Sequence, residues 1–390
     1  MTGTGGAIVG LGMSVQGRQL GISDRVLRRI ALEQALQDAG LGRGDIDGYI
    51  RVGSGGFEDH RYLGLSPRFS YSLQSGGASP AISVLSAIGA ILLGQANYVA
   101  CVYGEAFTSS VSSVTPASAP ASLEARDIGA AAYGYPYLFG QVGPVSAYAQ
   151  SARRHMHRYG TTSEHLGVVA VQERAYGCVR PGTIEEGRPI TLEDHQRSRM
   201  IVEPFRLLDC CRSTDGGVAI IVTSAERAVD CRARPVDVLG IGSGHGIRSW
   251  HEGHMFEDRD VGRAAATAFG QAGVTPDDVD VAELYAPFSF AVIAQLEEYG
   301  FCARGEGGPF VAAGETGPKG SIPTNTGGGH LSGFYATGFT PLSEGILQAR
   351  GDAPTNQIPG AEVVLVSGSG GNAGINGSAA HATLLLGGRR

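Results

Sequence analysis

Charge is scarce in this sequence, and positive charge is not in excess. Of the 390 residues, 17% are charged, and 37 Asp and Glu outnumber 30 Lys and Arg, which gives a net charge of −7. A protein that binds DNA or RNA normally has a clustered basic face, so a nucleic acid is not an expected partner. Hydrophobic residues make up 42% of the chain, which is enough for a large core and excludes a disordered protein.

Paired cysteines and phosphate-binding motifs are also missing. The six cysteines include no CxxC pair, so we expect reduced thiols in a cytoplasmic protein. The first residues, Met1 to Gly5, have neither the basic nor the apolar segment of a signal peptide. There is no P-loop, and Gly10–Val15 lacks the third glycine of a dinucleotide fingerprint. A nucleotide cofactor is therefore not expected.

One stretch without charge, between Arg68 and Glu105, needs to be weighed as a membrane span. A span needs about 20 mostly apolar residues, whereas Ser, Gln, Asn, Gly and Pro interrupt this stretch throughout. We interpret it as a helix at 81–93 that is buried on all sides, followed by a buried strand at 98–103. No membrane span is expected.

Glycine is abundant, and part of it belongs to an internal repeat. The 61 glycines are about double the usual share of roughly 7%. The run Ile8–Gly12 is typical of a short buried strand, and Val238–Gly242 repeats it. After each copy a helix is expected to end at a glycine, Gly40 or Gly273. The strands that follow are expected at 48–52 and 281–285. Two copies are too few for a solenoid and indicate a duplicated α/β half.

The duplicated halves should share a buried sheet. The apolar runs 218–223 and 363–367 show no alternation, which is typical of strands inside a sheet that is covered on both faces. We therefore predict an N-terminal half at 1–230 and a C-terminal half at 231–390.

A region at about 111–211 interrupts the α/β pattern of the first half. It begins with a loop rich in Ser, Ala and Pro, and it ends with expected amphipathic helices at 147–158 and 163–176. Its aromatic cluster, Tyr133–Phe139, is either part of the core of this region or one wall of an apolar substrate pocket.

Three motifs together resemble the thiolase superfamily over essentially the whole chain. They are Leu207–Gly217 (LLDCCRSTDGG), Gly300–Glu306 (GFCARGE) and Asn325–Leu331 (NTGGGHL). The resemblance is greatest to the lipid-transfer-protein branch. It implies a thiolase fold, with duplicated halves in a five-layered α/β/α/β/α core and an inserted loop domain. It also implies CoA-thioester substrates, no separate cofactor and a homodimer.

Both thiol positions of a thiolase are occupied by other residues. The thiolase nucleophile is a Cys at the start of a buried helix, where the helix dipole favours a thiolate. The matching segment here, Ser75–Pro80, has Gly77 at that position. The position of the second, proton-shuttling Cys falls near Ser367. Catalysis through an acyl-enzyme is therefore not expected.

Two tyrosines stand where thiolases carry their other reacting polar groups. Tyr335 lies ten residues after Asn325, at the position of the thiolase His, and Tyr285 takes the position of an Asn or His in a Glu-x-(Asn/His) turn. The pattern is similar to the steroid side-chain-cleaving aldolases of the same branch, and the resemblance implies that both phenols are catalytic. Those aldolases often have an acidic residue after the first Tyr, whereas this chain has Ala286 and Pro287.

The reaction that this resemblance implies is a retro-aldol cleavage. It would convert a 17-hydroxy steroid-CoA into a 17-ketosteroid and a short acyl-CoA such as propionyl-CoA. The step needs a base, a donor for the enolate and an acid. A phenol titrates near about 10, so a phenolate base needs a lowered pKa or a concerted transfer. The alternatives are a related enzyme that makes or breaks C–C bonds of a non-steroid acyl-CoA, a non-catalytic acyl-CoA or lipid carrier, and tyrosines that merely fill the core.

Three histidines are further candidates for the lining of the site. His251 and His254 do not have the helical spacing of a metal pair, so a loop beside the acyl pocket is the preferred interpretation and no metal is expected. His330, five residues before Tyr335, could orient a group, carry a proton or cap a turn.

The resemblance also implies a protein partner. Members of this branch commonly act with a small DUF35 protein, an OB fold that often carries a zinc ribbon. A steroid needs a concave apolar pocket, and glycine-rich stretches such as 327–329 and 368–371 supply few bulky walls. The alternative is that the inserted region of the homodimer closes the site by itself.

Overall fold

The protein is described from a computed structural model, which covers residues 3–53, 58–111, 143–245, 260–370 and 380–388. Within these ranges nine strands form one mixed sheet in the order β3-β2-β4-β7-β1-β8-β11-β10-β9. The strands are β1 (Gly6–Met13), β2 (Gly48–Val52), β3 (Phe69–Leu73), β4 (Val99–Ala106), β7 (Asp215–Ser224), β8 (Val236–His245), β9 (Val281–Glu283), β10 (Val363–Gly370) and β11 (Ala380–Gly388).

The sheet consists of two half-sheets with the same internal order. Strands β2, β4, β7 and β1 pair as β9, β10, β11 and β8 do, with one parallel and two antiparallel contacts in each series. The β3 position of the second half is represented by a single parallel bridge between Thr324 and Ala282 of β9. The halves meet through a short contact in which Ala7 and Ile8 face Asp237 and Val236. The duplication expected from the sequence is confirmed.

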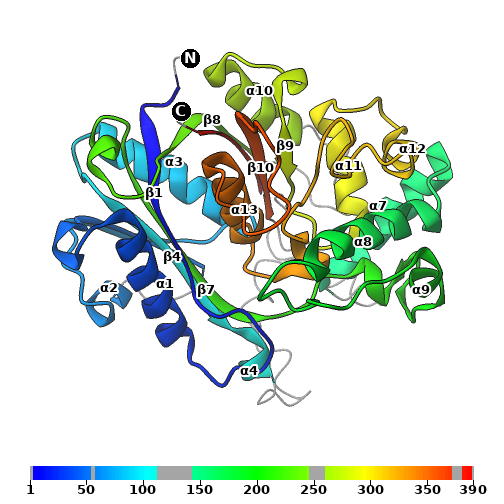
Figure 1. Cartoon of the computed structure of the whole chain (residues 1–390), viewed down its shortest axis with the longest axis horizontal. Coiled ribbons are helices and arrows are strands. Elements are labelled where there is room, and N and C mark those ends of the chain that lie inside the picture. The colour runs from blue at the N-terminus through cyan, green and yellow to red at the C-terminus, as the bar shows by residue number, and fades with distance from the viewer. Residues whose placement is uncertain (1–2, 54–57, 112–142, 246–259, 371–379, 389–390) are drawn as a thin grey trace, which may run out of the picture.

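Helices complete the five layers. The helices α3 (Ser79–Leu92) and α13 (Phe339–Arg350) pack between the half-sheets, α1 (Asp24–Ala39) covers β1, β4 and β7, and α10 (Asp260–Ala272) covers β8 and β11 (Figure 1). One apolar cluster joins both half-sheets through the two central helices, and two further clusters lie under the outer helices. The predicted order α/β/α/β/α is confirmed.

The inserted region lies against the second half. Its described part contains α7 (Gly143–Tyr159), α8 (Ser163–Cys178), α9 (Leu192–Arg197) and the hairpin of β5 (Met200–Val202) and β6 (Phe205–Arg206). Helix α8 packs on α11 (Ser289–Tyr299) and α12 (Gly307–Ala312) at the right of Figure 1, α7 packs on α11, and α9 packs on α8. The predicted cluster Tyr133–Phe139 lies outside the described residues.

Short helical turns connect the layers. They are α2 (Asp59–Tyr62), α4 (Phe107–Val111), the 3-10 turns η1 (Arg43–Asp45), η5 (Leu207–Asp209), η6 (Arg227–Asp230) and η7 (Pro276–Asp278), and the π-helical turn η8 (Gly329–Gly333).

Most predicted elements agree with the structure, and one strand is shorter than expected. The helix expected to be buried on all sides is α3, and this expectation is wrong, because Leu85 and Leu92 are exposed. Helices α1 and α10 end before Gly40 and Gly273, whose φ angles of 73° and 68° are left-handed. The strand expected at 281–285 ends at Glu283, because side chains from distant elements bind the next two backbone N–H groups. The division of the chain near residue 230 stays a prediction.

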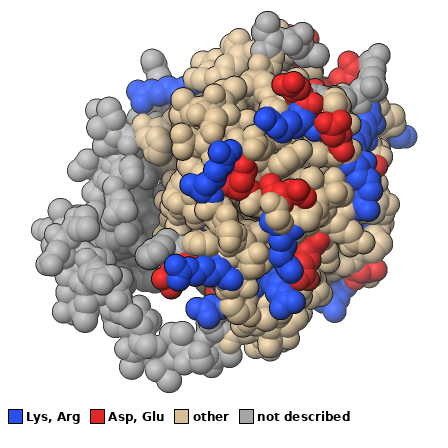
Figure 2. Space-filling model, turned by 90° about the vertical axis from the view of Figure 1, so that its left-hand side faces the viewer, with Lys and Arg blue, Asp and Glu red and all other residues tan. Residues whose placement is uncertain are grey.

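The described part of the chain contains no helix that is both long and apolar enough to span a membrane. Figure 2 shows that acidic and basic side chains intermingle on the face at the left of Figure 1. The described residues of this face therefore form no field of a single sign that would attract a polyanion.

Candidate active site

The two candidate tyrosines come from different loops and meet in space. Tyr285 follows β9, and Tyr335 follows the π-helical turn η8. Their hydroxyl oxygens lie 3.0 Å apart, within hydrogen-bonding distance. Tyr285 is buried and Tyr335 is half-buried. The structure therefore brings together the two phenols that the sequence comparison singled out.

Ser367 and Gln295 fix the backbone of Tyr285. The Tyr285 N–H donates to Ser367 Oγ (2.8 Å), and Ser367 Oγ donates to Gln295 Oε1 (2.6 Å). Gln295 Nε2 in turn donates to the Tyr285 carbonyl oxygen (2.8 Å). Ser367, which was expected from the sequence near the position of the second thiolase thiol, thus holds a backbone amide in place.

One hydroxyl fixes the backbone of Tyr335. The Tyr335 N–H donates to Thr214 Oγ1 (3.0 Å), and Thr214 Oγ1 donates to the Tyr335 carbonyl oxygen (3.1 Å). Thr214 belongs to the motif at 207–217 that carried the family resemblance. This contact gives that motif a role in placing the second phenol.

Gly77 leaves room for the ring of Tyr285. A Cβ atom at residue 77 would overlap the Tyr285 ring and the Ser369 carbonyl oxygen. Neither group is the end of a flexible side chain, so any larger residue would displace the site. The phenol of Tyr285 therefore occupies the space that a nucleophile at this position would need.

His330 lies between the two phenol-bearing loops. Its Nδ1 accepts a hydrogen bond from the Ala286 N–H (3.3 Å), and its Nε2 lies 2.9 Å from the carbonyl oxygen of Thr337. Because a carbonyl can only accept, Nε2 carries the proton. The ring centroid is 4.8 Å from that of Tyr285 and 5.3 Å from that of Tyr335. Burial lowers the pKa of His330 to about 4, so the ring is neutral at pH 7.

The electrostatics of the site keep both phenols protonated. Burial raises the pKa of Tyr285 well above its ordinary value, and the neighbouring Tyr335 adds to the shift. Burial and the nearby Cys211 thiol likewise raise the pKa of Tyr335. A lowered phenol pKa, one of the two routes considered from the sequence, is therefore wrong for this structure. Concerted proton transfer is the route that the environment allows.

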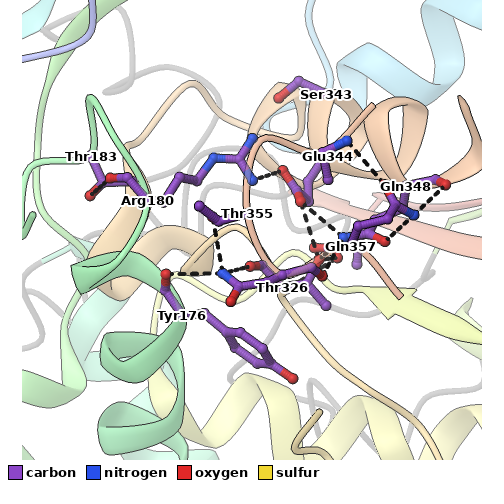
Figure 3. Close-up of polar contacts among 12 residues, drawn as sticks. Tyr176, Arg180, Thr183, Thr326, Ser343, Glu344, Gln348, Thr355 and Gln357 are labelled. Atoms are coloured by element: carbon purple, nitrogen blue, oxygen red, sulfur yellow. Dashed lines mark hydrogen bonds and ion pairs between the residues drawn. The ribbon is translucent and has the colours of Figure 1, made fainter. Parts of the chain in front are cut away.

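Buried carboxyl groups support the glycine loop behind the phenols. Thr326 Oγ1 lies 2.7 Å from Glu283 Oε1 and accepts from Gln348 Nε2 (2.8 Å). Figure 3 shows the Arg180 guanidinium directed at Glu344, with Gln348 on the other side of that carboxylate. Burial and the neighbouring Glu344 raise the pKa of Glu283 well above its ordinary value.

Asn325 and Glu173 tie the glycine loop to the inserted region. Asn325 has a positive φ of 54°, and its Oδ1 accepts from the Leu284 N–H (2.7 Å). Glu173 of α8 accepts from Asn325 Nδ2 (2.7 Å) and from the Leu331 N–H (3.2 Å). Burial raises the pKa of Glu173 to about 8. The buried carboxyl group of Glu173 thus binds both the start of the glycine loop and its π-helical turn.

The sequence did not single out several of these supporting residues. Gln295 is the one amide in the apolar part of α11, SFAVIAQL, which is a signal for a buried polar contact. Glu173 gave no such signal, because its partners are far away in the chain. His251 and His254 lie outside the described residues. Among the described residues no three His, Cys, Asp or Glu side chains are grouped as metal ligands.

Known proteins resemble the chain over nearly its whole length. The family described as "Thiolase C-terminal domain-like" matches residues 242–386. The steroid side-chain-cleaving aldolase of Thermomonospora curvata is 36% identical over 93% of this chain and 95% of its own. The 17-hydroxy-3-oxo-4-pregnene-20-carboxyl-CoA lyase of Mycobacterium tuberculosis is 35% identical over 94% of this chain and 96% of its own.

A solved structure extends the likeness to three dimensions. The Ltp2-ChsH2(DUF35) aldolase has a TM-score of 0.88 and 34% identity, with 100% of this chain and 99% of that chain covered. A human mitochondrial 3-ketoacyl-CoA thiolase, 14% identical, has the same fold with a TM-score of 0.69. The chain therefore belongs to the thiolase superfamily.

Proposed function

We propose that the protein is an aldolase that cleaves the side chain of a 17-hydroxy steroid-CoA thioester by a retro-aldol reaction. The products would be a 17-ketosteroid and a short acyl-CoA such as propionyl-CoA. The observation that carries the proposal is the pair of hydroxyls, 3.0 Å apart, beside a glycine at the nucleophile position. Relatives of matching length that are named as an aldolase and as a lyase of such a thioester support it.

The two phenols supply a proton relay for this reaction. One phenol oxygen takes the proton of the substrate hydroxyl while the bond between the hydroxyl-bearing carbon and the α-carbon of the thioester breaks. The first carbon becomes a ketone, and the electron pair of the broken bond passes to the α-carbon as a thioester enolate. The other phenol gives its proton to that carbon, and a proton crosses the hydrogen bond between Tyr285 and Tyr335. Both phenols begin and end neutral, in agreement with their raised pKa values.

This route needs neither an acyl-enzyme nor a cofactor beyond the CoA of the substrate. Gly77 offers no nucleophile, and burial raises the pKa of the nearby Cys211 thiol to about 12, so a thiolate is scarce at neutral pH. All six cysteines are free thiols, which fits the reducing conditions of the cytoplasm.

We further propose that the chain works as a homodimer with a DUF35 partner. The solved structure at 34% identity carries a DUF35 component in its name. A self-contact is supported by β3, which lies at the sheet edge and pairs among the described strands with β2 alone. Leu92 and Leu93, at the end of α3, are 69% and 77% exposed. An open edge and exposed leucines are features that a second subunit would cover.

The test is turnover of a 17-hydroxy steroid-CoA by the chain, alone and with a DUF35 partner, followed by mass spectrometry of the products. The account predicts stoichiometric ketosteroid and short acyl-CoA. Tight binding of the thioester without turnover in the presence of the partner would indicate a carrier. If the protein cleaved only non-steroid hydroxyacyl-CoA thioesters, the substrate would not be a steroid and the aldolase reaction would stand. Full activity of the isolated homodimer would show that no DUF35 partner is needed, and the proposed aldolase activity would stand.

A further inference from the structure

We infer that His330 is a positioning residue that sets the relative placement of Tyr285 and Tyr335 and that it carries no proton during the reaction. The inference rests on the proposed aldolase function. It concerns one of the three roles that the sequence left open for this histidine, and the contacts of the ring decide between them.

Both ring nitrogens of His330 are engaged by backbone. Nδ1 accepts from the Ala286 N–H, next to Tyr285 in the chain, and Nε2 donates to the Thr337 carbonyl, two residues after Tyr335. A second proton on Nδ1 would face the Ala286 N–H and would remove this hydrogen bond. The ring can therefore bind both loops only in its neutral form with the proton on Nε2.

The surroundings of the ring favour support over proton transfer. His330 is fully buried, and the titratable side chains in ring contact with it are the phenols of Tyr285 and Tyr335. The hydroxyls of these phenols face each other, whereas the two nitrogens of His330 bind backbone groups of Ala286 and Thr337. Protons can thus cross between the phenols directly, while the imidazole holds the loops that carry them.

The backbone of Thr337 supports the same role. This β-branched residue has a φ of +51°, and its buried Oγ1 has no hydrogen-bond partner. Such a conformation costs on the order of 1–3 kcal/mol and persists where the surroundings demand it. In this conformation the Thr337 carbonyl oxygen accepts a hydrogen bond from the His330 Nε2–H. The strained residue is therefore the one whose carbonyl oxygen links His330 to the loop that carries Tyr335.

Selective isotope labelling gives a test that does not depend on activity. We would record the side-chain ¹⁵N shifts of His330 in the full chain, assigned with a His330→Gln variant, between pH 5 and 8. The inference predicts the neutral tautomer with the proton on Nε2 throughout. Titration near pH 6–7, or a proton on Nδ1, would overturn it. A neutral ring in a protein that shows no aldolase turnover would leave this geometry standing while the proposed function fails.

Kinetics of substituted proteins give the second test. Asn can keep the acceptor for the Ala286 N–H and Gln can keep the donor to Thr337, whereas Ala keeps neither. We expect His330→Ala to lower kcat by about 100-fold, because a displacement of about 1 Å has that effect on aligned groups. The Asn and Gln variants should recover part of the loss, KM should change by less than about threefold, and the shape of the pH profile should stay the same.

A matched control separates these effects from the general loss of a histidine. His157 is exposed on α7, and His157→Gln should leave kcat, KM and the pH profile unchanged. If His330 carried a proton, Asn, Gln and Ala would be equally inactive, and an inflection of the wild-type profile between pH 5 and 7 would vanish with them. Full activity of His330→Ala would likewise overturn the inference.

Discussion

The turn before α3, at residues 75–79, and the turn before α13, at residues 336–340, occupy equivalent places in the two halves. In the first turn the Ser75 N–H donates to Ser79 Oγ (2.6 Å), and in the second the Ala336 N–H donates to Thr340 Oγ1 (2.9 Å). The second residue of each is left-handed, with φ of 57° at Gly76 and 51° at Thr337. The turns also touch, because a Cβ atom at Gly338 would overlap the Gly77 carbonyl oxygen.

The side chains of the two turns differ. The first turn has glycine at the left-handed position and again at Gly77, so it presents backbone to the site. The second turn follows Tyr335 and has Thr337 in the strained position, where glycine would be the relaxed choice. The first turn thus contributes no side chain that could react, and both phenols of the candidate site come from the second half of the chain.

The largest expected effect comes from removing either phenol hydroxyl. Tyr285→Phe and Tyr335→Phe should each lower kcat by a factor of about 100 to 10,000, because each removes one link of the proposed proton relay. Circular dichroism and thermal melting should show an intact fold. Near-normal kcat in both variants would mean that these phenols only fill space.

Acid should weaken the second turn more than the first. The pKa of His330 is lowered to about 4 in the folded chain, below the ordinary value of about 6.5, so the unfolded chain binds more protons in this window. Stability is therefore present above pH 6.5 and is lost as the pH falls toward 4, by at most about 3 kcal/mol from this ring. Urea unfolding between pH 4 and 7 measures the slope, which should be smaller in His330→Gln. If the unfolding free energy changed equally with pH in the wild type and in His330→Gln, the lowered pKa of His330 would be contradicted.

A side chain at the first turn should collide with Tyr285. We expect Gly77→Ala to destabilise the protein by about 1–3 kcal/mol through overpacking and to abolish turnover. In a double-mutant cycle, Tyr285→Ala should relieve about 1 kcal/mol of that cost, because the ring is one of the two groups in the way. Additive effects on unfolding free energy would mean that the ring does not fill the nucleophile's space.

The smallest effect concerns the left-handed residues themselves. Thr337→Gly should stabilise the fold by up to about 1 kcal/mol, while Gly76→Ala should destabilise it by about 1 kcal/mol, since the two turns need the same φ. Thermal denaturation of both variants measures the pair. If the melting temperatures of both variants changed in the same direction, the two turns would not need the same φ.

Local signals in the sequence were enough for much of the fold. Gly40 and Gly273 marked helix ends because a left-handed residue after a helix is a local property. The position of Tyr335 was predicted from its distance to Asn325 in a shared motif. The repeat indicated two similar halves, and the order of the layers was implied by the family that the motifs resemble.

Contacts between residues that are far apart in the chain could not be predicted from local signals in the sequence. The need for glycine at residue 77 comes from a ring that lies 208 positions later, and the end of β9 comes from Asn325 and Ser367. The role of His330 depends on two backbone groups, which leave no mark on residue type. Tertiary contacts, and not the local sequence pattern, therefore determine Gly77, the end of β9 and the role of His330.

In the proposed mechanism a pair of phenols performs the cleavage without a covalent intermediate. The most direct measurement is intact-protein mass spectrometry during turnover of a 17-hydroxy steroid-CoA, with ketosteroid and short acyl-CoA followed in the same samples. We expect both products to accumulate while the protein keeps its unmodified mass. An acyl adduct on a cysteine, formed and lost in step with product release, would contradict it.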